Sequence, residues 1–151
     1  MFTRRDFIKT TAAAAAGFSL SGPAAAAQSQ PNLFVSKRPP KDKRTFVSPI
    51  VEQTILQVKS FIRDPELAWM FENCFSNTLD TTTDFEIIDG RPDTFIITGD
   101  IDAMWLRDST CQVWPYMSLI PKEDKLRTLI QGLINRQVKC VLLDPYANAF
   151  Y

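Results

Sequence analysis

Acidic, basic and aromatic residues gather in one short stretch of the chain, residues 98–109. Within it stand Asp100, Asp102, Trp105, Arg107 and Asp108. Carboxylate and guanidinium groups can hydrogen-bond to neighbouring sugar hydroxyls, while an indole face covers the apolar side of a pyranose ring. A turn with a purely structural role rarely needs all three kinds of side chain. The stretch is therefore a candidate carbohydrate-binding loop.

Several of these residues also have a structural interpretation, which the sequence leaves open. Asp108 or Ser109 can cap the helix that follows the loop. Asp100 can simply form a turn after a glycine. Arg107 can neutralise a buried aspartate instead of binding a ligand.

Two of the tryptophans and all three cysteines are candidates for buried core positions. Trp105 and Trp114 can both be buried, and for Trp114, which lies within an expected helix, a core position is favoured. Cys74, Cys111 and Cys140 are odd in number, lack C-x-x-C spacing and have apolar neighbours. We expect them to be small core residues rather than a disulfide pair.

Two helices are predicted ahead of the loop. Ser48 followed by Pro49 gives a capping residue and then a proline at the first helical position, and Asp64 followed by Pro65 repeats this signal. The two helices should form an αα-hairpin. Their apolar residues recur at helical spacing, with Val51, Ile55, Val58 and Ile62 in the first and Leu67, Phe71, Phe75 and Leu79 in the second.

A small β-hairpin is predicted between this helix pair and the loop. Residues 85–88 and 94–98 are rich in β-branched and aromatic side chains, and the turn-forming residues 89–93 connect them.

Two more helices should follow. One begins near Leu106, and Pro115 should kink or end it. The other covers residues 122–143, where apolar residues keep to one broad face until Asp144 and Pro145 stop the helix.

The first residues have the pattern of an export signal. Arg4 and Arg5 precede a mildly apolar run over 10–20, and the alanines at 24–27 offer cleavage sites. We predict a twin-arginine signal peptide over residues 1–27 and export to a periplasmic or extracellular location. The apolar run is too short and alanine-rich to span a bilayer comfortably, so no stable membrane insertion is expected after cleavage.

Residues 28–45 are polar, with prolines and basic residues, and are expected to be an exposed linker, which leaves 46–151 as the folded part.

The composition of the chain excludes several classes of function. The formal net charge is 0 at pH 7, and no nucleic-acid-binding surface is expected. The chain has no histidine, the commonest ligand of catalytic zinc, copper and iron, so any metal would need carboxylates alone.

Three stretches of the chain resemble glycoside hydrolase family 125, the metal-independent exo-α-mannosidases. They are residues 98–109, 112–116 and 144–150, and the resemblance covers about Phe46 to the end. It implies an all-α fold, the N-terminal part of an (α/α)6 barrel, with the small β-hairpin inserted between helices. It also implies hydrolysis of non-reducing terminal α-1,6-linked mannose with inversion, a mannose-containing glycan as substrate, and neither metal nor cofactor.

The resemblance also implies roles for individual residues. Asp100, Asp102, Trp105, Arg107 and Asp108 become substrate-pocket residues. Tyr146 and Asn148 should approach the same pocket if successive helices alternate in direction. The catalytic residues of this chain are unknown, because the general acid, an aspartate, and the general base, a glutamate, are expected beyond Tyr151.

The length of the chain argues against a complete barrel. A twelve-helix toroid needs about 200 residues, so we expect a truncated domain that is inactive by itself and leaves an apolar flank uncovered. The alternatives are another (α/α)6 carbohydrate-active enzyme, recognisable by a different product, and an inactive truncated fragment that binds glycans.

Overall fold

The computed structural model describes residues 34–151. The expected signal peptide and the first part of the expected linker lie outside this range. Within it the chain is mostly helical, with one small two-stranded sheet, and the helices and strands follow one another in the predicted order. None of the helices in this range combines the length and the apolar character that a bilayer crossing requires.

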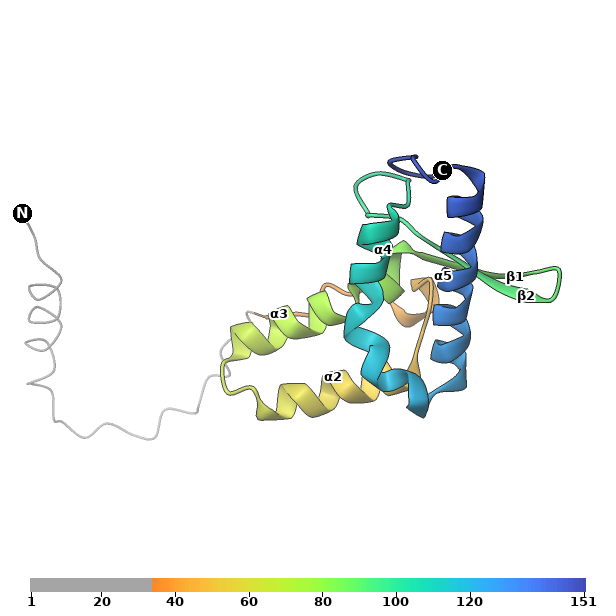
Figure 1. Ribbon diagram of the computed structural model, residues 1–151. Helices are drawn as coiled ribbons and strands as arrows, with labels where there is room; N and C mark the ends of the chain where they lie inside the picture. Colours follow the sequence, from red (N-terminus) through yellow and green to blue (C-terminus); the bar gives the residue numbers. More distant parts are fainter. Residues whose placement is uncertain (1–33) are drawn as a thin grey trace, which may run out of the picture. The chain divides into compact units, whose positions relative to one another are not determined.

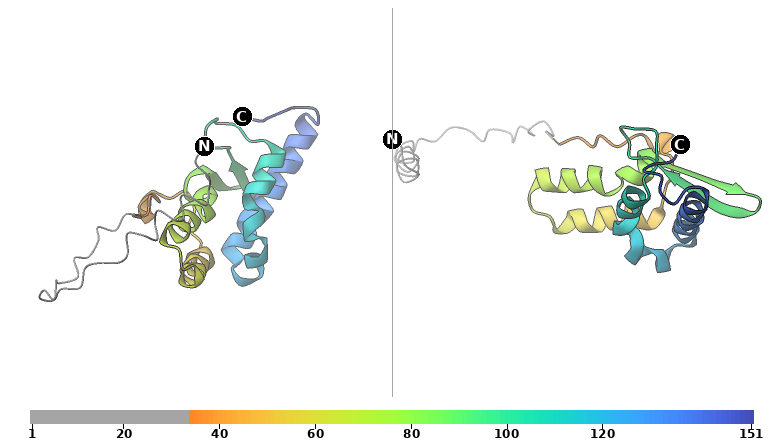
Figure 2. Two further views of the ribbon diagram at one scale, coloured as in Figure 1. Left: turned by 90° about the vertical axis from the view of Figure 1, so that its left-hand side faces the viewer. Right: turned by 45° about the horizontal axis from the view of Figure 1, so that its top comes forward.

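The first helix pair forms as its caps predict. Helix α2 (Pro49–Phe61) and helix α3 (Pro65–Phe75) lie side by side as an αα-hairpin (Figures 1 and 2). The Ser48 hydroxyl accepts a backbone N–H at 3.3 Å, and the Asp64 carboxylate accepts two, at 2.9 and 3.1 Å. Each cap satisfies N–H groups that the first helical turn leaves free.

The β-hairpin is present, but its turn is shorter than predicted. Strand β1 (Thr83–Ile88) pairs antiparallel with strand β2 (Arg91–Ile96). Asp89 and Gly90 alone connect them, at positive φ angles of 51° and 73°, the backbone of a type I′ turn. The longer connection predicted from the sequence is wrong, because Pro92 is accommodated inside the outer part of a two-stranded hairpin, where an edge position needs no N–H.

Helix α5 (Asp124–Leu143) packs closely on strand β2 (Figure 1). A methyl group added at Gly132 would lie 2.4 Å from Thr94 Oγ1 and 3.0 Å from the backbone carbon of Asp93. The Thr94 hydroxyl also donates to the Leu129 carbonyl at 2.8 Å. The helix and the strand therefore approach at a distance that only glycine permits.

A buried carboxylate reinforces this contact. The Asp93 side chain is 2% exposed and accepts hydrogen bonds from Arg136 Nε, at 2.5 Å, and from Lys139 Nζ. Burial by itself would raise the pKa of Asp93, but the bonds from Lys139 and Arg136 lower it below its ordinary value. The two basic side chains of α5 thus bind the strand electrostatically.

The helix that follows residues 97–105 changes from an α-helix to a 3₁₀-helix next to Pro115, where the sequence predicted a kink or an end. Helix α4 (Leu106–Val113) is followed directly by the 3₁₀-helix η3 (Trp114–Lys122), which has Pro115 in its first turn. The predicted core position of Trp114 is wrong, since its side chain is 69% exposed. Tyr116 is buried instead, and its hydroxyl donates to the Phe75 carbonyl at 2.5 Å.

The cysteine prediction holds in part. Cys140 is buried, as expected, whereas Cys74 and Cys111 are exposed. All three are free thiols, which agrees with the expectation of no disulfide pair.

Most residues of the described part of the expected linker, 34–45, are exposed, but Arg38 attaches the segment to the fold. The Arg38 guanidinium is buried and donates to both carboxylate oxygens of Asp80, at 2.7 and 3.1 Å, and to Glu52. Asp80 is itself buried and also accepts from the Ser76 hydroxyl at 2.8 Å. These ion pairs attach the segment before α2 to the fold, and losing one of the buried charges would weaken that attachment.

The hydrophobic core joins all these elements. It lies between the inner faces of α2, the hairpin, η3 and α5. Its fully buried members include Val51, Leu79, Ile96, Met104, Tyr116, Leu126 and Leu129.

Replacing Gly132 by alanine tests the close contact between α5 and β2. Helix propensity favours alanine by at most about 1 kcal/mol. The clash with Thr94 and Asp93 outweighs this gain, and we expect a net loss of about 2 kcal/mol in the free energy of unfolding, measured by urea denaturation. The control is Gln131→Ala at the neighbouring exposed position, and equal stability of the two variants would contradict the packing.

The ion pairs of Asp93 predict a dependence of stability on pH. Because the folded-state pKa of Asp93 is lowered, its carboxylate stabilises the fold above the ordinary aspartate pKa of about 3.9, and this stabilisation is lost as the pH falls through the folded-state value. The Asp93→Asn variant should be less stable at pH 6 and should lose less stability between pH 5 and pH 3. Parallel losses of the urea midpoint in both proteins would exclude this role.

Candidate functional site

Two loops meet at the end of helices α4 and α5 that carries the C-terminus (Figure 1). The Met104 N–H donates to the Phe150 carbonyl at 2.8 Å, and the Phe150 N–H donates back to Met104 at 3.0 Å. Both side chains are buried in the core. The structure thus joins residues 97–105, the first loop, to residues 144–150, the second loop. This is the juxtaposition expected from helices that alternate in direction.

The first loop is shaped by a tight local turn. Gly99 has a φ of 108°, a conformation that side-chain-bearing residues rarely adopt. The Thr98 hydroxyl donates to the Asp100 carboxylate at 2.9 Å, and the Thr98 N–H donates to the Ala103 carbonyl at 3.3 Å. Asp100 therefore does form a turn, as its structural interpretation proposed. Asp100 and Asp102 are both exposed to solvent.

The first turn of α4 presents the charged pair of the motif. Trp105 occupies the N-cap position and is half-buried. An Arg107 Nη nitrogen lies 3.0 Å from an Asp108 carboxylate oxygen, and the Arg107 side chain is 79% exposed. The capping interpretation of Asp108 and Ser109 is wrong, because α4 begins before them and no side chain caps it. Arg107 is paired with a partly exposed aspartate rather than a buried one.

The second loop begins with a turn made by a side chain. The Asp144 carboxylate accepts the Tyr146 N–H at 2.9 Å. Tyr146 is 95% exposed and Asn148 is exposed. Within residues 34–151, neither side chain hydrogen-bonds to the polar residues of the first loop. The two loops are joined through their backbones, and their polar side chains remain open to solvent.

The arrangement suits hydrogen bonding to a ligand rich in hydroxyl groups. The paired loops carry carboxylates, an amide, a phenol and the Trp105 ring, and the first turn of α4 adds a guanidinium group and another carboxylate. In the described part of the chain, no group of three or more histidine, cysteine or acidic side chains is placed to hold a metal ion.

Sequence reasoning missed the two residues that join the loops. Met104 and Phe150 were not among the candidate site residues, because apolar side chains suggest packing rather than function. The available signal was that each is a large apolar residue inside a motif rich in polar side chains, as expected where a loop must be anchored in the core.

Comparison with known proteins identifies the family. Residues 64–151 match the sequence model of a glycoside hydrolase family, so the chain carries part of a glycoside hydrolase domain. The family is GH125, described as metal-independent alpha-mannosidase, and the chain belongs to it. Residues 1–21 match the signal sequence of the twin-arginine translocation pathway, which supports export to the periplasm or the extracellular space.

A relative from fission yeast extends the match beyond the family model. The chain is 48% identical over 115 residues to the meiotically up-regulated gene 157 protein of Schizosaccharomyces pombe. The match covers 76% of this chain but only 23% of the yeast protein. The chain thus spans about a quarter of the length of this relative.

Proposed function

We propose that this chain provides part of an inverting exo-α-1,6-mannosidase domain that acts on non-reducing terminal mannose of a glycan. The observation that carries the proposal is the pairing of Met104 with Phe150, which brings both family motifs to one end of the helices. Family membership supports the glycosidase chemistry, and the export signal agrees with a substrate outside the cytoplasm.

The exposed side chains of the site have distinct roles in this proposal. Arg107 offers forked donors to hydroxyl oxygens, Asp102 and Asp108 accept from sugar hydroxyls, and Trp105 covers the apolar face of the ring. Asp100 orders the turn and presents its second oxygen to the ligand. Tyr146 and Asn148 extend the same surface from the second loop.

The acid and base of the reaction are assigned to residues outside this chain. An inverting glycosidase uses two carboxyl groups on opposite sides of the sugar. They are far enough apart for a water molecule to fit between one of them and the sugar. The chain spans 23% of the length of the yeast relative, so a longer protein of this kind has ample room for both. Without that pair, the paired loops can bind a sugar but cannot hydrolyse it.

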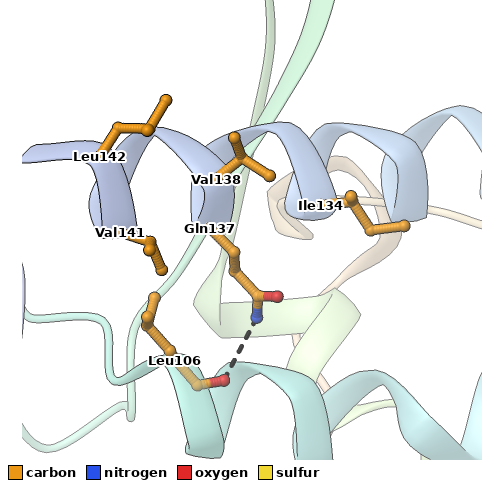
Figure 3. Close-up of a pocket in the computed structure, with 6 residues that line it drawn as sticks. All are labelled: Leu106, Ile134, Gln137, Val138, Val141 and Leu142. Atoms are coloured by element: carbon orange, nitrogen blue, oxygen red, sulfur yellow. Dashed lines mark hydrogen bonds between the residues drawn. The ribbon is translucent and has the colours of Figure 1, made fainter. Parts of the chain in front are cut away.

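An exposed apolar face supports the proposal of a larger helical barrel. A hollow of about 300 Å³ lies between the start of α4 and the last turns of α5 (Figure 3). Ile134, Val138 and Leu142 recur on one side of α5 and are largely exposed, in line with the uncovered apolar flank expected of a truncated domain. Further helices of an (α/α)6 barrel would cover this face. The lining residues are Leu106, Ile134, Gln137, Val138, Val141 and Leu142.

The 151-residue chain made alone should show no mannosidase activity. It lacks the expected acid and base, and its apolar face is uncovered. The measurement is release of free mannose from α-1,6-mannobiose by the purified chain. Hydrolysis that disappears in an Asp102→Ala variant would contradict the assignment of the acid and base to residues elsewhere.

In a polypeptide that carries this sequence within a complete family domain, Arg107→Ala or Asp108→Ala should lower kcat/KM at least about a hundredfold. This corresponds to about 3 kcal/mol of transition-state contacts. The matched control is Arg127→Ala, which removes another exposed ion pair, with Asp124, far from the loops along α5. Wild-type kinetics in folded Arg107 and Asp108 variants would remove both residues from the site.

A further inference from the structure

Two glutamine side chains bind main-chain carbonyls at the two ends of the first loop. Gln112 Nε2 donates to the Ile97 carbonyl at 3.0 Å, where the chain leaves β2. Gln137 Nε2 donates to the Leu106 carbonyl at 3.2 Å, where the chain enters α4 (Figure 3). The loop that carries the acidic residues and Trp105 lies between these two attachment points.

Gln137 also engages the turn that carries the charged pair. Besides the Leu106 carbonyl, its Nε2 lies 3.0 Å from Ser109 Oγ and 2.9 Å from Thr110 Oγ1. These oxygens lie on either side of Arg107 and Asp108 in the sequence. Figure 3 shows the amide extending from α5 towards the first turn of α4. The amide thus fixes that turn against the helix that leads to the second loop.

Gln112 attaches the same helix to the start of the first loop. It stands one helical turn after Asp108 on α4, and its amide donates to the Ile97 carbonyl, directly after β2. Its Oε1 is buried and has no hydrogen-bond partner within residues 34–151. The donor bond to Ile97 is therefore what orients the amide, because the reversed orientation would turn an oxygen towards a carbonyl oxygen.

We propose that Gln112 and Gln137 are positioning residues for the substrate-binding loop. The inference rests on the proposed function, and it adds residues that act through the backbone rather than by touching the sugar. The two amides hold the ends of the loop at a fixed separation and orient the first turn of α4. Small displacements of groups that contact a substrate are costly, and about 1 Å can reduce turnover by about a hundredfold.

The test removes each donor without adding a charge, in a polypeptide that carries this sequence within a complete family domain. Gln112→Met and Gln137→Met keep the approximate length of the side chain. The matched control is Asn135→Leu, because Asn135 Nδ2 on α5 makes the same kind of bond, at 2.8 Å, to the Pro92 carbonyl of the hairpin and not to the loop. The measurements are Tm, kcat and KM with α-1,6-mannobiose at a temperature well below Tm.

We expect both glutamine variants to raise KM and to lower kcat/KM by roughly tenfold or more. The Asn135→Leu control should lower Tm and leave KM unchanged. A purely structural role would reduce the fraction of folded enzyme, which changes apparent kcat but not KM. Unchanged KM in both glutamine variants, or an equal change in the control, would overturn the inference.

A parallel Arg107→Ala variant separates this inference from the function on which it rests. A large loss in Arg107→Ala with wild-type kinetics in both glutamine variants would reject only the positioning role. Wild-type kinetics in Arg107→Ala would reject the proposed site and the positioning role together.

Discussion

The close contact between helix α5 and strand β2 determines where both loops lie. Strand β2 ends where the first loop begins, and α5 ends where the second loop begins. Gly132 lets the two backbones approach, and the buried Asp93 carboxylate binds two basic side chains of the helix. Because close packing resists small changes of distance, the strand and the helix form one rigid support. The loops at their ends can then pair through the backbone without ordering each other's side chains.

In the proposed site, backbone groups join the loops and the polar side chains are left exposed. Met104 and Phe150 place apolar side chains in the core and use their backbone groups to join the loops. The polar residues around them face solvent, as the exposed side chains of Arg107 and Tyr146 show. A surface of this kind can bind hydroxyl groups, but chemistry on a glycosidic bond also needs two correctly separated carboxyl groups. The proposed reaction therefore requires parts of the family domain beyond this chain.

The sequence predicted well those features that depend on neighbouring residues. The caps at Ser48 and Asp64 formed as expected, because N-cap geometry is local. Burial was predicted less well, since it depends on distant contacts. Trp114, where α4 gives way to the 3₁₀-helix η3, is exposed, and Arg38 is buried where it donates to Asp80, far along the chain. The site motif was recognisable from its residue types, whereas the loop pairing that unites its two parts needed the fold.

The paired-loop site is tested most directly by hydrogen–deuterium exchange of a complete family domain that contains this sequence, with and without a thio-linked, non-hydrolysable α-1,6-mannobiose. The sugar analogue should slow exchange in residues 97–108 and in residues 144–150 together, because the two loops and the first turn of α4 form one proposed binding surface. Protection in only one of these segments, or in neither while the analogue binds elsewhere, would contradict the claim that the paired loops form the substrate site.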